Sequence, residues 1–365
     1  MNSDNIKLKV QLNNYPSWQL TNRQICDLEL ILNGSFHPLN GFLSKDDYDS
    51  VLKEMRLKNG SLWPIPITLD VNDDFVKKII NEPKITLRDN EGFALAVLSI
   101  SDIWKPDLKL EAESVFGTLD VKHPGVNYLL NIANKNYIGG ALEMISLPYH
   151  HDYSDYRHSP FELKSFFKTK GWKKIVAFQT RNPLHRAHFE LTKNAMNDLG
   201  ANLLIHPVVG MTKPGDVNHY TRMRCYQHVI NEYKENSAKL SILPLAMRMG
   251  GPKETLLHAI IRKNYGCTHL IVGRDHAGPG IDSYENPFYG PYDAQEMMKK
   301  HQNEIGIKMV PFKFMVYVPR TGDYKPIDEV GENEDYKTLS GTKLRELLDK
   351  GRGIPNWFTF KAVSR

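Results

Sequence analysis

The chain's 365 residues are enough for two or three domains, and 41% hydrophobic with 24% charged residues is typical of a soluble globular protein. A net charge of +5 is too small to indicate a nucleic-acid-binding protein by itself, although it suits a protein that binds small anions. Three distant cysteines argue against a disulfide framework, and without a signal-peptide core or an apolar run of about 20 residues we expect a reduced, cytoplasmic protein outside the membrane.

Short strand-like and helix-like stretches alternate irregularly in the first part of the chain. The β-rich patterns predict strands over 65–71, 84–87 and 94–100, and turn signals such as Asn59-Gly60 separate them. Short helical patterns lie at 46–55 and 73–81. We therefore predict a β-rich N-terminal domain over residues 1–155.

Residues 148–160 (PYHHDYSDYRHSP) carry no sustained periodicity and mark the expected domain boundary. Their histidines are scattered and no cysteine accompanies them, so the segment is interpreted as a solvated linker in preference to a metal site.

Strand and helix patterns alternate regularly after this linker. The predicted strands are 175–178, 203–209, 240–243, 269–272 and 308–318, and the predicted helices are 186–199, 221–233, 253–264 and 294–302. Such alternation indicates βαβ units and a parallel sheet, over residues 156–318. Residues 319–365 are predicted to form a small α/β domain that ends in a helix over 342–349.

The stretch IVAFQTRNPLHRAH (175–188) passes abruptly from apolar to polar residues at the end of the first strand of this second domain. Asn182 suits a helix N-cap and Pro183 the first helical turn, so free backbone N–H groups and the positive helix dipole are expected there. His185 and His188 then share one face of the helix, and Arg181 can grip a tetrahedral anion in two places. The pattern predicts an anion site.

A metal site is the alternative interpretation of the two histidines. The spacing is HxxH, however, no third ligand is obvious nearby, and the flanking arginines would repel a cation. We therefore predict no metal ligands here. A purely structural role for both histidines is weakened by the neighbouring Gln179, Arg181 and Asn182.

The segment HLIVGRDHAGPG (269–280) repeats this design: an apolar strand is followed by Arg274, Asp275, His276 and small residues. Small residues let backbone amides approach a ligand closely. Two further loops, 208–216 with Lys213 and 245–254 with Arg248, also follow strand-like stretches. Together the four loops are predicted to converge on one rim and bind a polyanionic substrate. No GxxxxGK[ST] or GxGxxG motif occurs, which disfavours ordinary kinases and dehydrogenases.

Several long segments resemble the ATP-sulfurylase (sulfate adenylyltransferase) family. The resemblance covers QTRNPLHRAH and GRDHAGPG, and it continues in TKPGD, in LAMRMGGPKETLLHAIIRKNYG, in FYGPYDAQE and in SGTKLRELLDKGRGIPNWF. GSFHPLNGF near the N-terminus is similar too, so nearly the whole chain is involved. The resemblance implies a multi-domain α/β fold: a PUA-like N-terminal domain, a Rossmann-like nucleotidyltransferase domain with a parallel sheet, and the small C-terminal domain.

The resemblance also implies a reaction and the residues that perform it. The family transfers the adenylyl group of MgATP to sulfate, giving adenosine 5′-phosphosulfate and pyrophosphate. Sulfate would be held by Gln179, Arg181 and the backbone of Ala277. The residues implied for catalysis are Thr180, Arg181, Asn182, His185, His188 and Arg274. Because sulfate is already deprotonated, catalysis would rest on positioning and charge stabilisation.

The nucleotide site is implied in the same way. The residues that would contact ATP are Gln179, Arg181, Asn182, His185, His188, Gly273, Arg274, Asp275, His276 and Met315. Phe312 matches a position linked to nucleotide-induced rearrangement. Ser340, Thr342 and Arg345 either contact ligand or cap a helix, and the sequence leaves both alternatives open.

Further expectations concern cofactors and partners. The resemblance implies Mg²⁺ as MgATP and a homo-oligomer, and the absence of cysteines after Cys267 predicts no protein-bound zinc. Without a phosphate-binding GxxxxGK[ST] motif, a monofunctional enzyme is expected. The competing interpretations are an RNA-binding PUA-like module and another nucleotidyltransferase with a His-x-x-His loop. Basic residues in strand-end loops, without interleaved aromatic residues, favour the enzyme and predict no nucleic-acid partner.

Overall fold

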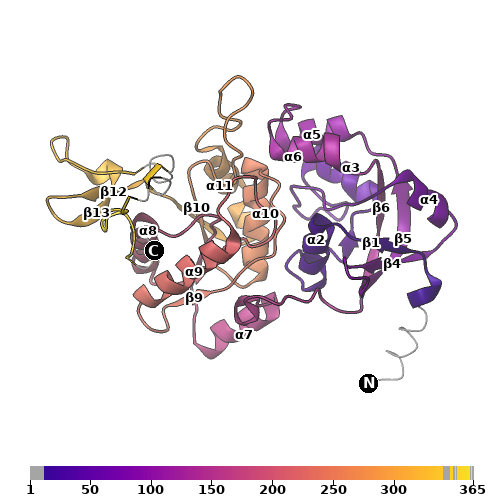
Figure 1. The fold of residues 1–365 in the computed structure, drawn as a ribbon, viewed down its shortest axis with the longest axis horizontal. Helices are drawn as coiled ribbons and strands as arrows, with labels where there is room; N and C mark the ends of the chain where they lie inside the picture. Colours follow the sequence, from indigo (N-terminus) through magenta and orange to yellow (C-terminus); the bar gives the residue numbers. More distant parts are fainter. Residues whose placement is uncertain (1–11, 340–345, 348–349, 351, 362, 364–365) are drawn as a thin grey trace.

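The computed structural model describes residues 12–339, 346–347, 350, 352–361 and 363. Figure 1 shows three parts along the longest axis: the N-terminal domain on the right, an α/β domain in the middle and a small C-terminal part on the left. None of the helices in the described part of the chain is both long and apolar enough to span a bilayer.

The N-terminal domain is built on a six-stranded mixed sheet. Its strands are β1 (Ser17–Gln19), β2 (Gly41–Phe42), β3 (Leu69–Val71), β4 (Lys84–Arg88), β5 (Ala94–Trp104) and β6 (Asn136–Met144). They pair in the order β1-β4-β5-β6-β2, with β3 also on β6, and the β1–β4 pair is parallel. The prediction of a β-rich domain is confirmed, although the predicted strand 65–71 is a strand in its last three residues alone.

Short helices and helical turns complete this domain. They are η1 (Leu12–Asn14), α2 (Asn22–Leu32), α3 (Lys45–Glu54), α4 (Asp73–Ile79), α5 (Leu108–Phe116), α6 (Pro124–Asn127) and η2 (Tyr128–Ile132). Local capping explains where they begin: Thr21, Ser44 and Asn72 each accept a backbone N–H of the first turn that follows. The predicted helices 46–55 and 73–81 correspond to α3 and α4.

The middle domain is a five-stranded parallel sheet between two layers of helices. Its strands are β7 (Ile175–Phe178), β8 (Asn202–Ile205), β9 (Ala238–Leu240), β10 (His269–Val272) and β11 (Lys308–Pro311). The order β11-β10-β7-β8-β9 confirms the predicted Rossmann-like parallel sheet. The direction of strand order reverses between β7 and β10, which is where such sheets bind ligands.

The helices of this domain cover both faces of the sheet. They are α7 (Pro160–Thr169), α8 (Arg186–Leu199), α9 (His219–Val229), η4 (Ile230–Glu232), α10 (Gly251–Asn264) and α11 (Asp293–Ile305). Residues of the wholly buried β7 alternate between two apolar clusters: Ile175 and Ala177 pack with α10, and Val176 and Phe178 with α8 and α9.

The predicted strand 308–318 is wrong as a single strand. The chain leaves the sheet after β11, and β12 (Met315–Val318) pairs instead with β13 (Asp323–Pro326) in a separate antiparallel hairpin. Pro311, the last residue of β11, was the available signal in the sequence, because a proline within a strand pattern argues against one continuous central strand. A helical turn, η5 (Ile327–Glu329), follows.

The N-terminal and middle domains share one buried apolar cluster, which runs from the first sheet to α10 and α11. A buried ion pair crosses the same junction, with Arg248 Nη2 2.6 Å from Asp27 Oδ2 on α2. Figure 1 shows α2 and α10 facing each other at this junction.

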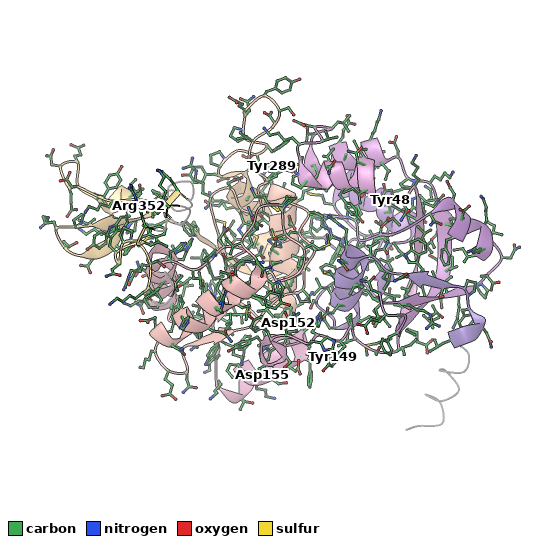
Figure 2. All side chains as sticks on the ribbon, in the orientation of Figure 1. Tyr48, Tyr149, Asp152, Asp155, Tyr289 and Arg352 are labelled. Atoms are coloured by element: carbon green, nitrogen blue, oxygen red, sulfur yellow. The ribbon has the colours of Figure 1, made fainter. Side chains whose placement is uncertain are left out.

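The connection between the two domains includes η3 (Ser154–Tyr156), and Figure 2 labels Tyr149, Asp152 and Asp155 along it. The interpretation of this linker as simply solvated is incomplete, because its side chains are held on both sides. His150 lies 2.9 Å from Glu29 of α2, and Asp152 binds both Arg157 and His219 of α9.

Candidate active site

The loop after β7 is held in place by its own polar residues. The Thr180 hydroxyl accepts the Asn182 N–H and donates to the Asn182 carbonyl, both at 3.0 Å. The Tyr226 hydroxyl of α9 donates to that carbonyl as well, at 2.8 Å. The Val208 N–H donates to the Thr180 carbonyl. These bonds fix the backbone that carries Gln179 and Arg181 at the sheet's carboxyl edge.

The prediction that Asn182 caps a helix is wrong. Helix α8 begins at Arg186, as the helical pattern indicated, and His185 occupies the cap position. The reason is the turn made by Thr180, because a side chain that bonds the local backbone offers an alternative to helical geometry. Asn182 is exposed, and Pro183 lies in the loop before the helix.

The N-terminus of α8 is also covered by other residues, which the sequence did not predict. The Arg186 N–H donates to the Phe358 carbonyl at 3.1 Å, and the Arg186 Nε donates to the Asn356 carbonyl at 2.7 Å. His185 Nδ1 lies 3.1 Å from the Thr359 hydroxyl. A C-terminal segment therefore docks on the first turn of α8 and occupies part of the predicted anion site.

Arg181 is oriented by an aspartate from the TKPGD loop. Its Nη1 lies 2.5 Å from Asp216 Oδ1, and both side chains are largely buried. The Lys213 Nζ of the same loop donates to the Pro279 carbonyl at 3.3 Å. The loops after β7 and β8 and the loop after β10 thus meet, as the strand order requires.

The loop after β10 adopts an uncommon backbone conformation. Asp275 and Ala277 have positive φ angles of 51° and 56°, a left-handed region that non-glycine residues rarely occupy. A Cβ on Gly278 would lie 1.9 Å from Asp275 Oδ1, so any side chain there would displace the Asp275 carboxylate. Strain of this kind is concentrated at ligand sites, and alternating left-handed residues turn backbone N–H groups toward an anion.

Several charged side chains surround the loop after β10. Burial raises the pKa of the Asp275 carboxyl, and the positive charges of Arg181, Lys213 and Arg274 oppose that rise. Arg274 is exposed at the tip of the loop. The predicted residues of the two motifs are therefore close enough to influence one another electrostatically.

The two histidines of the first motif are neutral near neutral pH. Burial lowers the pKa of His185 to about 3, with a smaller contribution from His188, and burial lowers the pKa of His188 to about 4. The His185 N–H donates to His188 Nδ1 at 3.3 Å, so the proton of His188 resides on Nε2. His188 can therefore donate a hydrogen bond without carrying a charge.

Phe312 and Met315 lie on the same side of the sheet as these histidines. The Phe312 ring centroid is 6.4 Å from that of His188, and its N–H donates to the Val272 carbonyl. Met315 is buried at the start of β12, which packs against α8. Ser340, Thr342 and Arg345 lie outside the described residues, as does most of the predicted helix 342–349.

Arg248, which the sequence placed on the rim, is structural instead, and so is Arg222 of α9. Arg222 is 2% exposed and donates to the carbonyls of Val208 and Val217. Arg248 is 6% exposed and pairs with Asp27 at the domain junction. The prediction that four basic loops line one rim is therefore wrong for Arg248, and Arg222 adds nothing to the rim.

Sequence reasoning missed two buried residues of α10 beside the first loop. His258 Nε2 lies 3.2 Å from the Gln179 amide, and Glu254 Oε1 lies 3.6 Å from the same His258 nitrogen. A Glu and a His four residues apart inside an apolar helix were the available signal. The described part of the chain contains no cluster of three or more His, Cys, Asp or Glu residues arranged to hold a metal ion.

Comparison with known proteins decides the family of this chain. The family described as ATP-sulfurylase matches residues 154–365, which include both loops of the site and the whole parallel sheet. The chain belongs to the ATP-sulfurylase family. The family described as PUA-like domain matches residues 2–147, which confirms the predicted fold class of the N-terminal domain.

Relatives within the ATP-sulfurylase family are similar over nearly all of this chain. The sulfate adenylyltransferase of Eremothecium gossypii is 51% identical over 95% of this chain and 69% of its own length. The corresponding enzyme of Kluyveromyces lactis is 52% identical over the same shares, and that of Saccharomyces cerevisiae is 50% identical over 95% of this chain and 68% of its own.

A solved structure has the same fold over the full length of this chain. It is described as a hexameric APS kinase from Thiobacillus denitrificans, with a TM-score of 0.80 and 28% identity. The match covers 100% of this chain and 64% of the other, so the present chain spans about two thirds of the length of the proteins it resembles.

Proposed function

We propose that this protein is a sulfate adenylyltransferase, which transfers the adenylyl group of ATP to sulfate and releases pyrophosphate. The observation that carries the proposal is the junction of two family motifs at the reversal point of the sheet. The loop with Gln179 and Arg181 follows β7, and the loop with Arg274 and Ala277 follows the adjacent β10. Parallel sheets of this order bind nucleotides at this position.

Sulfate would bind between Arg181, the Gln179 amide and the backbone N–H of Ala277. The ion pair with Asp216 restricts Arg181, so little side-chain freedom is lost when the anion arrives. The left-handed Ala277 supports a backbone concavity for one sulfate oxygen. This arrangement offers hydrogen-bond donors and positive charge without a nucleophilic side chain.

The nucleotide would enter from the side of α8. Neutral His188, with its proton on Nε2, would donate to a phosphate oxygen as negative charge develops there, and Arg274 would neutralise the departing pyrophosphate. Thr180 and Asn182 would act by fixing the loop geometry. Gly273, Asp275, His276, Phe312 and Met315 would line the nucleotide site, and Mg²⁺ would arrive as MgATP.

The transfer would be a single in-line displacement. A sulfate oxygen forms a bond to the α-phosphorus while the bond to the pyrophosphate oxygen breaks, so atoms and charge are conserved without a covalent enzyme intermediate. A cytoplasmic location, a homo-oligomer and domain boundaries near residues 155 and 318 remain predictions of the sequence.

Labelled sulfate provides a direct test of product identity. Incubation with ATP should move the label into a compound that co-migrates with adenosine 5′-phosphosulfate. Label that stays in free sulfate while ATP is consumed would contradict the proposal. Exchange of labelled pyrophosphate into ATP in the absence of sulfate would contradict direct transfer, since it requires an adenylylated enzyme.

A further inference from the structure

A chain of hydrogen bonds links the two loops of the site through the interior of α10. The Gly273 N–H donates to His276 Nδ1 at 3.4 Å, and His276 Nε2 lies 3.0 Å from His258 Nδ1. The other nitrogen of His258, Nε2, lies 3.2 Å from the Gln179 amide. His258 is fully buried, so water does not compete for these contacts.

The backbone N–H of Gly273 determines which ring nitrogen carries the proton in His276 and, through it, in His258. Burial lowers the pKa of His276 to about 3 and also lowers the pKa of His258, so each ring is neutral and carries one proton. The N–H of Gly273 is a donor, which leaves His276 Nδ1 as an acceptor and puts the proton on Nε2. His276 then donates to His258 Nδ1, and the proton of His258 must be on Nε2.

Glu254 supports the same assignment from the opposite end. Burial raises the pKa of its carboxyl, but the nearby His258 imidazole and hydrogen bonds from the backbone N–H groups of Arg248 and Gly250 outweigh burial and bring the pKa to about 2. The carboxylate is therefore ionised. Its Oε1 lies 3.6 Å from His258 Nε2, and a proton on that nitrogen is the favourable arrangement.

The orientation of the Gln179 amide follows from this proton. Glu254 Oε1, at 3.6 Å, is beyond hydrogen-bond distance from His258 Nε2, whereas the Gln179 amide lies at 3.2 Å. The acceptor of the His258 Nε2–H is therefore the Gln179 amide oxygen, and the –NH₂ group faces away from His258. The oxygen and nitrogen of an amide have nearly the same shape, and the hydrogen-bond network decides between them. The structure has Gln179 Nε2 facing His258 Nε2 at 3.2 Å, which places two donors together, and it leaves Gln179 Oε1 buried without a partner in the described part of the chain; exchanging the amide oxygen and nitrogen removes the clash between the donors.

We propose that His258 and His276 are positioning residues that hold the Gln179 amide as a hydrogen-bond donor, so that the site selects a fully ionised tetrahedral dianion over hydrogen phosphate. The inference rests on the proposed function. Sulfate at neutral pH has no proton and accepts from every donor of the site. Hydrogen phosphate keeps an O–H group, which would meet the –NH₂ of Gln179, the guanidinium of Arg181 and the N–H of Ala277 without an acceptor.

Asp216 holds Arg181 through Oδ1, and its Oδ2 is buried without a hydrogen-bond partner in the described part of the chain. The Asp275 carboxylate lies beside Gly278, and its residue is exposed. The series of hydrogen bonds from Gly273 through His276 and His258, here called the relay, controls the orientation of Gln179.

Two substitutions of His258 test the relay. His258→Leu removes the donor, whereas His258→Gln places an –NH₂ near the position of the imidazole Nε2 and restores it. For the leucine variant we expect the KM for sulfate to rise about 10- to 100-fold, with the KM for ATP changed less than about threefold. Inhibition by inorganic phosphate should stay the same or strengthen, and the glutamine variant should recover most of the sulfate affinity.

His158→Leu is the matched control. His158 is a partly buried histidine of the middle domain, and its Nδ1 lies 3.1 Å from the hydroxyl of Ser241, which follows the edge strand β9. The His158→Leu variant should keep the wild-type KM values for sulfate and ATP and the wild-type inhibition by phosphate. A folded His258→Leu protein with normal sulfate KM and normal discrimination against phosphate would overturn the proposal.

A second measurement decides the matter if the leucine variant does not fold, and it does not depend on activity. Nitrogen-15 NMR of histidine-labelled wild-type protein should show His258 and His276 as neutral Nε2–H tautomers, with assignments from the glutamine variants. An Nδ1–H tautomer or a charged ring at either residue would overturn the relay. Absence of sulfate-dependent turnover in the wild type would instead refute the proposed function and leave the tautomer result standing.

Discussion

Arg181 and Asp216 form an ion pair across two loops of the sheet, with Nη1 2.5 Å from Oδ1 and exposed fractions of 18% and 7%. The pair joins the loop after β7 to the loop after β8. Because both side chains are largely buried, Arg181 is fixed before any anion binds. The finding gives Asp216 a role that follows from geometry: it positions the guanidinium and leaves the remaining N–H groups for ligand.

The substitution Asp216→Ala should chiefly lower kcat. Without its partner Arg181 becomes mobile, and a misplacement of this kind costs about 10- to 100-fold in rate. The KM for sulfate should change by less than about threefold, because removal of a competing negative charge offsets the loss of orientation.

A surface ion pair of the same length provides the control for Asp216. Arg56 Nη1 lies 2.5 Å from Glu304 Oε1, but the two side chains are 35% and 40% exposed and connect the N-terminal domain to α11. Glu304→Ala should leave kcat unchanged, since exposed pairs contribute little. Normal turnover by Asp216→Ala would show that Arg181 needs no anchor.

Arg181→Ala and Arg274→Ala should each lower kcat/KM by more than about 100-fold, because each removes a positive charge aimed at the reacting anions. Arg274 is exposed, and Arg181 lies in a loop, so the unfolding temperature should change little. Arg224→Ala is the matched control, because Arg224 is an exposed arginine of α9 outside the site. Near-normal turnover by either site variant would refute its assignment.

The fold could be predicted from the sequence where the signal is local. Apolar strands between amphipathic helices indicated a parallel sheet, and β7, β10 and α8 have the predicted bounds. The order of the strands depends on packing between distant segments, which periodicity does not record. The site depends on β7 and β10 being neighbours in the sheet. The predicted fold class implied that they are neighbours, and no single motif indicated it.

Three of the errors share a physical cause: the partner that decides each one lies far away in the chain. Arg248 belongs to a loop that looks exposed, but Asp27, 221 residues earlier, draws it into the domain junction. The open terminus predicted for α8 is covered by the segment around Phe358. His258 was overlooked because a histidine in an apolar helix is typical of a packed core, and its contact with Gln179 appears once the sheet is formed.

Acid should destabilise the protein well before its carboxylates are protonated. Burial lowers the pKa of four histidines to about 3 or 4, namely His123, His185, His188 and His276. In the unfolded chain a histidine titrates at about 6.5. As the pH falls below that value, the unfolded state binds protons that the folded state excludes, and each such histidine lowers the free energy of unfolding by up to about 1.4 kcal/mol per pH unit.

Buried carboxyls act in the opposite direction. Burial raises the pKa of Glu111 to about 7, and it also raises the pKa values of Asp27 and Asp275, so the folded state binds these protons first as the pH falls. The histidines outnumber these carboxyls, and denaturant unfolding should show lower stability at about pH 5 than at about pH 7. The double variant with His185→Asn and His188→Asn should lose less of its free energy of unfolding between these two pH values. Stability that is constant or rises between these pH values would contradict the neutral state assigned to the site histidines.

Pyrophosphate release from ATP, measured on the purified protein with sulfate present and with sulfate omitted, shows whether sulfate is the acceptor of the adenylyl group. The assignment of Arg181 and Gln179 to sulfate and of His188 and Arg274 to the phosphates predicts release that requires sulfate, saturates with it, and is lost in Arg181→Ala. Pyrophosphate release at the same rate without sulfate would contradict the account, because the attacking oxygen would then come from another acceptor.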